Sequence, residues 1–333
     1  MENETTSSGW NYNMSEKRPR VMIDGSPPES LRKLLQPVEL VPWQQRPSEE
    51  LHDVVAIFTY QHPPVDGELM DALPNCKVIS NHGVGVDHID LAAATARNLP
   101  VGHTPDVLSG AVADLAIGLM LAAARRLPES VQLAAAPDTL VFDQSKMNGW
   151  DMYGATLGVL GLGRIGEQIA RRAVGFQMPT LYRNRNRRSE LEASLELSYV
   201  SFDQLLAESD FLVIATPLNE ETRKMIGLEQ LRAMKPSAVL VNIARGGIVD
   251  TDALVTALDE GAIRAAALDV TEPEPLPRDH PLLQFPNAIV TSHIGSATQQ
   301  TRQKMAELAS ENLMLGLEGL PLRRQANRDL SPE

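Results

Sequence analysis

Residues 156–173 read TLGVLGLGRIGEQIARRA, and the fold prediction rests mainly on this segment. A short apolar run, a glycine turn and an amphipathic segment follow one another, which is the strand–turn–helix order of a dinucleotide-binding unit. The first glycine permits a tight turn, the second lets the backbone approach a pyrophosphate, and the third lets the helix meet the strand. The helix N-terminus offers unpaired N–H groups to the phosphates. We therefore expect a dinucleotide to bind at Gly161, Gly163, Arg164, Ile165 and Gly166.

On both sides of this unit, short β-rich runs alternate with helix-like stretches, which predicts an α/β fold with parallel sheets and crossover helices. The expected strands are residues 20–24, 38–41, 54–58, 77–80, 156–160, 180–183, 211–215, 238–243, 265–269 and 288–291. The expected helices are residues 28–35, 67–73, 107–127, 166–175, 201–208, 229–234, 251–260 and 298–318. A chain of 333 residues fits about two domains.

Two of the expected helices bear on the organisation of the chain. Residues 107–127 are apolar on most faces, so we expect this helix to be buried between domains or, as we favour, in a subunit interface. We expect the final helix, residues 298–318, to pack back on the first domain.

The composition excludes several classes of partner. A net charge of −13 and a pI near 5.1 argue against nucleic acid or an anionic membrane. No run approaches the ~18 to 20 apolar residues of a membrane span. The single cysteine, Cys76, excludes an internal disulfide and a thiolate metal cluster, and it fits a reducing compartment such as the cytoplasm. Residues 1–17 are polar and acidic and are expected to be a disordered tail rather than a targeting signal.

The end of the second strand of the dinucleotide unit predicts which cofactor is preferred. An NAD-binding fold usually places a carboxylate there, to accept from the ribose hydroxyls. Residues 181–188 instead read LYRNRNRR, with four arginines within six positions. Guanidinium groups suit a 2′-phosphate, so we expect NADPH over NADH, with contacts from Arg183, Asn184 and Arg185. The alternative is a solvated basic loop.

Three further segments follow predicted strands, at the sheet edge where open α/β folds carry their sites. They are residues 241–250 (VNIARGGIVD), 268–275 (LDVTEPEP) and 291–298 (TSHIGSAT). Reduction of a 2-keto acid needs a cation for the carboxylate and keto oxygen, a proton donor and a hydride source. Arg245 suits the first task, and His293 beside a carboxylate such as Glu274 suits the second. The other six histidines are interpreted as structural: His52, His62, His82, His88, His103 and His280.

At these residues the chain resembles the D-isomer-specific 2-hydroxyacid dehydrogenases, and among them the glyoxylate/hydroxypyruvate reductases. The likeness covers residues 20–321. It rests on GVGVDH at 83–88, TPDVL at 104–108, the glycine turn, the Arg245 segment, LDVTEPEPLP at 268–277 with HPLL at 280–283, and HIGSAT at 293–298.

The resemblance implies a role for each part of the site. Arg245, Glu274 and His293 would form the catalytic triad, with Glu274 rather than Glu272 as its acid. The backbone amides of Val84 and Gly85 would receive the substrate carboxylate, together with Arg245 and His293. Further cofactor-binding residues would be Asp269, at the nicotinamide carboxamide, Thr216 and Pro217, which line the cofactor cleft, and Gly295. No metal is expected.

The resemblance also implies a domain plan with two Rossmann-like domains and the active site in the cleft between them. Residues 18–106 and 297–323 would form a discontinuous substrate-binding domain, and residues 107–296 the NADP-binding domain. A homodimer would form through residues 107–127, and residues 1–17 and 324–333 would be tails. Two departures stand out: Asp114 replaces a glutamate, and Lys146 or Met147 aligns where such reductases often carry a tryptophan, with Trp150 nearby.

The expected function is NADPH-dependent reduction of glyoxylate, hydroxypyruvate and other small 2-keto acids to the D-2-hydroxy acid, with NADH weaker. Two alternatives remain open. One is another D-2-hydroxyacid dehydrogenase, of phosphoglycerate or hydroxyphenylpyruvate type. The other is a non-catalytic, NAD(H)-gated docking dimer like the corepressors that share this fold.

Overall fold

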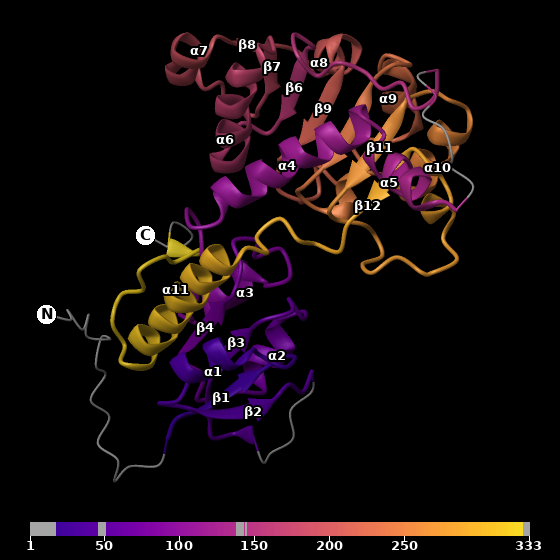
Figure 1. Ribbon diagram of the computed structural model, residues 1–333. Helices are drawn as coiled ribbons and strands as arrows, with labels where there is room; N and C mark the ends of the chain where they lie inside the picture. Colours follow the sequence, from indigo (N-terminus) through magenta and orange to yellow (C-terminus); the bar gives the residue numbers. More distant parts are fainter. Residues whose placement is uncertain (1–17, 46–50, 138–142, 144, 329–333) are drawn as a thin grey trace, which may run out of the picture. The chain divides into compact units, whose positions relative to one another are not determined.

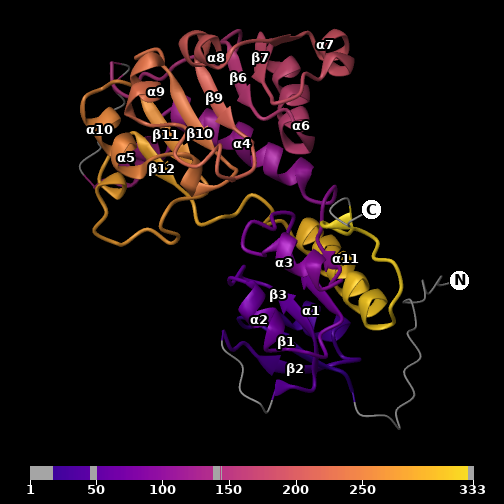
Figure 2. The same ribbon diagram turned by 180° about the vertical axis from the view of Figure 1, so that it is seen from behind.

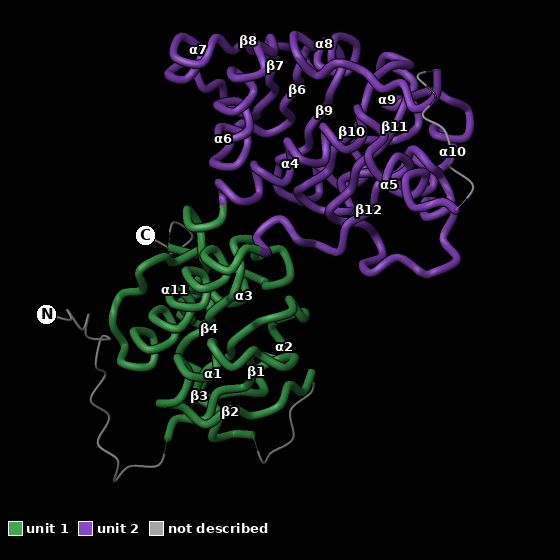
Figure 3. The backbone as a smooth tube through the Cα atoms, viewed as in Figure 1, with its two compact units in different colours: residues 1–108, 298–333 green, residues 109–297 purple. Residues whose placement is uncertain are grey.

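The computed structural model describes residues 18–45, 51–137, 143 and 145–328, so the predicted tail at residues 1–17 lies outside the described part of the chain. The chain divides into two compact units (Figure 3). Unit 1 comprises residues 1–108 and 298–333, and unit 2 comprises residues 109–297. Every strand pairing within the two sheets is parallel, which confirms the predicted α/β class.

Unit 1 is a parallel sheet covered by helices on both faces (Figure 1). Its strands are β1 (Arg20–Ile23), β2 (Glu39–Pro42), β3 (Val54–Thr59), β4 (Val78–Asn81) and β5 (Val101–Gly102), in the order β2-β1-β3-β4-β5. Its helices are α1 (Glu29–Leu34), α2 (Gly67–Asp71), α3 (Leu91–Ala96) and α11 (Gln299–Leu317).

Successive side chains of β1 point alternately into two hydrophobic clusters, one on each face of the sheet. Val21 and Ile23 pack in one buried cluster with Leu313 of α11, whereas Met22 packs in another with Leu69 of α2. Side chains of successive strand residues point to opposite faces, so a strand buried on both faces is apolar throughout. Figure 2 shows α2 and α11 in unit 1 from the opposite side. Helix α11 contacts α1, β3, β4 and β5, which confirms that the last helix returns to the first domain.

Unit 2 is a second parallel sheet, with the strand order β12-β11-β10-β9-β6-β7-β8. Its strands are β6 (Leu157–Leu160), β7 (Thr180–Arg183), β8 (Leu197–Tyr199), β9 (Phe211–Ile214), β10 (Val239–Asn242), β11 (Ala265–Leu268) and β12 (Ala288–Val290). Its α-helices are α4 (Ser109–Ala124), α5 (Leu127–Ala135), α6 (Arg164–Ala173), α7 (Ser189–Leu195), α8 (Phe202–Glu208), α9 (Leu228–Ala233) and α10 (Thr251–Asp259). The strand order reverses between β6 and β9, which is the switch point where such sheets bind ligands.

The helix predicted over residues 107–127 is shorter and is followed by a second helix. Helix α4 ends at Ala124, Arg126 takes a left-handed conformation with φ 51°, and α5 begins at Leu127 with a proline in its first turn. Because proline lacks an N–H and clashes with the preceding turn, it starts a helix more readily than it continues one. Helix α4 packs within unit 2 on α6 and on strands β10 and β11, which accounts for its apolar faces.

The sequence missed several short elements. Helix α3 has six residues and is capped by the side chain of Asp90, β5 has only two residues, and α7 and β8 follow the arginine-rich loop. Such elements are too short to display a hydrophobic period.

Residues 324–328, assigned to a C-terminal tail, are part of unit 1. Gln325 forms an antiparallel bridge with Gly102, and Ala326 N–H donates to Val101 O at 2.7 Å. Asn327 is buried and accepts from the N–H of Val101 at 3.1 Å. The segment reads as polar, but it covers the free edge of β5, and sheet edges need a partner.

Candidate active site

The glycine turn lies between β6 and α6, at the switch point of the unit 2 sheet. Gly161 has a φ of 102°, and a Cβ there would lie 2.6 Å from the backbone nitrogen of Thr216, just after β9. A Cβ at Gly166 would collide with the carbonyl oxygen of Gly161. A Cβ at Gly163 would meet nothing within 4 Å, so the backbone there is open to an approaching group. The turn therefore has the shape that a dinucleotide pyrophosphate needs.

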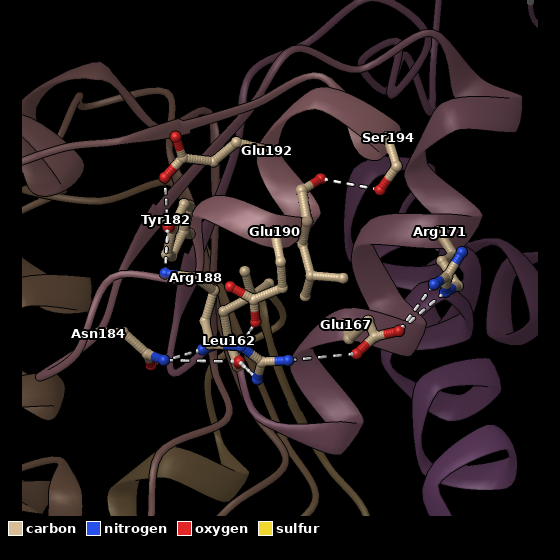
Figure 4. Close-up of polar contacts among 10 residues, drawn as sticks. Leu162, Glu167, Arg171, Tyr182, Asn184, Arg188, Glu190, Glu192 and Ser194 are labelled. Carbon is tan, nitrogen blue, oxygen red and sulfur yellow. Dashed lines mark hydrogen bonds and ion pairs between the residues drawn. The ribbon is translucent and has the colours of Figure 1, made fainter.

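The loop after β7 holds this turn in place (Figure 4). Asn184 Oδ1 accepts a hydrogen bond from the N–H of Leu162 at 2.8 Å. Arg188 Nη1 donates to the carbonyl oxygen of Leu162 at 3.1 Å. Asn184, predicted as a cofactor residue, thus uses its side chain to position the middle of the glycine turn.

The four arginines of this loop have different surroundings. Arg187 pairs with Glu192 at 2.7 Å, and Arg188 pairs with Glu190. The hydrogen bonds from Arg187 and Tyr182 lower the pKa of Glu192 to about 2. Arg183 donates to the hydroxyl of Tyr199 and lies over its ring, with Cζ 5.2 Å from the ring centroid.

Arg185 differs from the other three. It is exposed and makes no hydrogen bond or ion pair with any residue that the structure describes. Of the two arginines predicted to contact a 2′-phosphate, Arg185 is thus the one whose guanidinium is available for a ligand.

His293 and Glu274, the predicted proton-donor pair, are in contact. His293 Nδ1 lies 2.7 Å from Glu274 Oε1, and each side chain is 39% exposed. Burial raises the pKa of Glu274, but the hydrogen bond and charge of His293, the N–H of Thr271 and the charge of Arg245 together lower it below its ordinary value. Glu272 pairs instead with Arg223 at 2.9 Å. Unit 2 thus brings Arg245, Glu274 and His293 together.

Buried polar side chains hold the two loops that carry Arg245 and His293. Asn242 is 1% exposed, donates to the carbonyl oxygen of Arg245 at 2.8 Å and accepts from the N–H of Ala244 at 3.0 Å. Asn242 is not among the residues predicted from the sequence. The available signal is an asparagine at the end of a buried strand, three residues before the arginine.

Asp269 holds the loop that carries His293 in a similar way. Its carboxylate accepts hydrogen bonds from Thr291 Oγ1 at 2.6 Å and from the N–H groups of Ile294 and Gly295, both at 2.8 Å. His293 has a φ of 55°, a left-handed conformation that this clamp supports. The predicted partner of Asp269 was the nicotinamide carboxamide; within the protein the carboxylate orients the His293 loop. Gly295, predicted as a cofactor residue, lies within this clamp.

The remaining predicted residues lie at strand ends. Thr216 and Pro217 follow β9, and the carbonyl oxygen of Pro217 accepts from Thr222 Oγ1 at 2.7 Å. Val84 and Gly85 lie in unit 1, after β4. In the part of the chain that the structure describes, no three metal-binding side chains gather into a group, and each helix is too short or too polar to span a lipid bilayer.

Comparison with known proteins agrees with this arrangement. Residues 117–295 match the family described as "D-isomer specific 2-hydroxyacid dehydrogenase, NAD binding domain". The chain is 42% identical over 309 residues to a glyoxylate reductase of Thermococcus onnurineus, covering 89% of this chain and 92% of that one. It is 43% identical over 306 residues to a glyoxylate reductase of Korarchaeum cryptofilum, with the same coverage.

A solved structure extends the likeness to the fold. It is an NADPH-dependent glyoxylate/hydroxypyruvate reductase from Sinorhizobium meliloti in complex with NADP and malonate, which matches with a TM-score of 0.84 and 34% identity over 93% of this chain and 98% of that one. The glycine turn, the Arg245, Glu274 and His293 cluster and these relatives together show that the chain belongs to the D-isomer-specific 2-hydroxyacid dehydrogenases, an oxidoreductase family with an NAD-binding domain.

Proposed function

We propose that the protein is an NADPH-dependent reductase of glyoxylate, hydroxypyruvate and other small 2-keto acids. The product is the 2-hydroxy acid, in the D configuration where a stereocentre forms. The observation that carries the proposal is the 2.7 Å contact between His293 and Glu274, with the charge of Arg245 acting on the same carboxylate. The relatives that are glyoxylate reductases support the choice of substrate.

In this proposal each residue of the cluster has a separate task. The guanidinium of Arg245 binds the substrate carboxylate and polarises the keto oxygen. Glu274 accepts the hydrogen bond from Nδ1–H of His293, which orients the ring and balances its positive charge. Nε2–H of His293 then gives its proton to the keto oxygen. When bound, the reduced nicotinamide supplies the hydride that adds to the keto carbon.

The loop after β7 supports the choice of NADPH. No carboxylate stands at residues 183–188 to accept from ribose hydroxyls, and Arg185 is exposed without a partner among the described residues. A guanidinium at that position recognises a 2′-phosphate through charge-assisted hydrogen bonds. Arg183, which lies beside Tyr199, is the second contact we propose.

We also propose that two copies of the chain form a dimer. The sequence predicts the interface at residues 107–127, but α4 packs within unit 2, so we place the interface on the following helix, α5. None of the residues of this helix is buried, and Leu127 and Val131, four positions apart on one face, are 47% and 68% exposed. Exposed apolar residues clustered on one helix face mark interaction surfaces. Trp150 stacks under Arg264 of its own chain, with the guanidinium carbon 3.6 Å from the ring centroid. Light scattering should give the mass of a dimer for the wild type and of a monomer for Val131→Asp.

The deciding experiment is a matrix of two cofactors and four substrates. Oxidation of NADPH and of NADH is followed with glyoxylate, hydroxypyruvate, pyruvate and hydroxyphenylpyruvate. We expect the highest kcat/KM with NADPH and one of the first two substrates. Comparable efficiency with both cofactors would contradict the NADPH assignment, and turnover restricted to hydroxyphenylpyruvate would reassign the substrate. A protein that turns over none of the four but binds short peptides would be a docking dimer. We further propose a cytoplasmic location, which fractionation of cells tests.

A further inference from the structure

The loop after β4 in unit 1 has an unusual pattern of backbone hydrogen bonds. Three successive carbonyl oxygens are tied back to the protein. That of Gly83 accepts from Asn81 Nδ2 at 3.0 Å and from the N–H of Thr104 at 2.9 Å. That of Val84 accepts from His103 Nδ1 at 3.1 Å, and that of Gly85 accepts from Asn81 Nδ2 at 2.8 Å.

This pattern determines where the following N–H groups point. In a trans peptide the C=O bond and the next N–H bond lie in one plane and point in opposite directions. The N–H groups of Val84, Gly85 and Val86 are therefore directed away from Asn81 and His103. No residue that the structure describes accepts a hydrogen bond from any of the three. Successive N–H groups that point to one side of a loop can bind an anion together.

Asn81 is the residue on which the pattern depends. It is the last residue of β4 and is fully buried. Both hydrogens of its side-chain amide are used, on Gly83 and Gly85, and its Oδ1 accepts from Thr59 Oγ1 at 2.8 Å. Because the Thr59 hydroxyl donates to the oxygen side, the amide is held with its nitrogen towards the loop.

His103 completes the arrangement from a neighbouring segment. A carbonyl oxygen can only accept, so the ring nitrogen facing Val84 O must carry a hydrogen, which defines the tautomer. The position of His103 is itself supported by Asn312 of α11, whose Nδ2 donates to the carbonyl oxygen of His103 at 3.1 Å.

We propose that Asn81 and His103 are positioning residues that present a three-amide carboxylate site made by the N–H groups of Val84, Gly85 and Val86. The inference rests on the proposed function, to which it adds a third amide and the two side chains that aim all three. Since all the donors are neutral and belong to the backbone, the site recognises the carboxylate shared by small 2-keto acids and places no charge of its own near the substituent.

The test is Asn81→Asp, which keeps the shape of the side chain and removes both N–H donors. Hydrogen bonds to a charged group contribute enough that we expect KM for glyoxylate to rise about 10- to 100-fold. KM for NADPH should be unchanged and kcat should change less than KM. The dissociation constant of oxamate, a 2-keto-acid analogue that cannot be reduced, should rise by the same factor when measured calorimetrically with saturating NADPH.

A second pair of variants separates positioning from folding. His103→Asn keeps a donor close to the position of Nδ1 and should retain a near-normal KM, whereas His103→Leu removes the donor and should raise it. The matched control is Asn327→Asp, because Asn327 is also a buried asparagine that binds loops of unit 1. It should lower the unfolding temperature without raising KM.

The outcomes distinguish this inference from the proposed function. If the wild type reduces glyoxylate but Asn81→Asp and His103→Leu both keep its KM and the wild-type affinity for oxamate, the positioning roles are wrong and the proposed function stands. If the wild type neither reduces a 2-keto acid nor binds oxamate, the proposed function itself is wrong.

Discussion

Two buried asparagines, Asn81 in unit 1 and Asn242 in unit 2, each hold the loop that follows their strand. The two loops offer different groups to a ligand. Each is the last residue of a buried strand, β4 or β10, and each uses its amide to hold the loop that follows. Asn81 turns carbonyl groups inward, so that unpaired N–H groups remain for a ligand. Asn242 fixes the backbone of Arg245, whose charged side chain is the part proposed to bind and polarise the substrate.

The candidate functional groups of the two units therefore differ in kind. In unit 2 the candidate groups are ionisable side chains, namely Arg245, Glu274 and His293. In unit 1 they are backbone amides, and the nearby polar side chains serve only to aim them. An aimed backbone needs no charge, so it recognises an anion without titrating near neutral pH.

Of the substitutions considered, removal of the proposed proton donor in unit 2 should lower activity the most. General acid catalysis contributes about 10²- to 10⁴-fold, so His293→Ala should lower kcat with glyoxylate by that factor. The affinity for NADPH, measured by fluorescence titration, should stay close to that of the wild type. Near-full turnover in this variant would refute the role of His293.

Substitutions in the arginine loop test whether one arginine, rather than the overall charge of the loop, recognises the 2′-phosphate of NADPH. Arg185→Ser should raise KM for NADPH about 10- to 100-fold and leave KM for NADH nearly unchanged, because only NADPH carries the 2′-phosphate. Arg187→Ser is the matched control, since Arg187 is engaged with Glu192. Equal effects of the two substitutions on NADPH would show that the loop acts through its overall charge.

Acid pH should affect the stability of unit 1 through His82, beside the amide loop. Burial, with smaller contributions from the charges of Arg302 and His62, lowers the pKa of His82 to about 4. The unfolded chain takes up this proton first, so stability is fully present above about pH 6.5 and is lost as the pH falls towards 4. At pH 5 the loss is about 2 kcal/mol.

The substitution His82→Phe isolates this contribution. His82 lies near the rings of Phe58 and Tyr60, with centroids 6.4 and 5.1 Å away, and its Nδ1 has no partner among the described residues, so an apolar ring leaves no hydrogen bond of Nδ1 unmade. Urea unfolding at pH 7.5 and pH 5.0 should show a smaller difference in the variant. An unchanged difference would assign the acid sensitivity to other groups.

The smallest loss of activity is expected for Asn242→Asp, which can be compared directly with Asn81→Asp. Asn242→Asp keeps the acceptor for Ala244 N–H and loses one hydrogen bond to Arg245 O, so kcat with glyoxylate should fall about 10-fold. Asn81→Asp should instead act on KM. The two strand-end asparagines would prove interchangeable in function if both variants changed the same kinetic constant.

The sequence predicts the parts of this molecule that depend on local pattern. The alternation of apolar runs and helices identified both parallel sheets, and the spacing within residues 161–166 identified the dinucleotide turn. Gly161 shows why such a motif can be predicted from sequence. Its φ of 102° and its proximity to Thr216 exclude a side chain, so the position requires glycine. The segments after β10, β11 and β12 were recognisable because parallel strands present their carboxyl ends at one edge.

What the sequence could not predict depends on partners distant along the chain. The four arginines of residues 183–188 look alike, but two of them pair with glutamates that lie in a helix the pattern did not reveal. The break at Arg126 and the role of Asn327 likewise depend on contacts with remote segments. Asn81, Asn242 and Asp269 are ordinary strand-end residues until the loops that they hold are known.

The return of the chain from unit 2 to unit 1 has a consequence for biosynthesis. Unit 2 is a single stretch, residues 109–297, so all its strands are synthesised before α11. Unit 1 is completed later, because Ser80 of β4 donates to Ala309 O of α11 and residues 325–327 cover the edge of β5. Domains fold as units during synthesis. All of unit 2 is therefore made first, and unit 1, which carries the amide loop, is completed only after residues 325–327 have been synthesised.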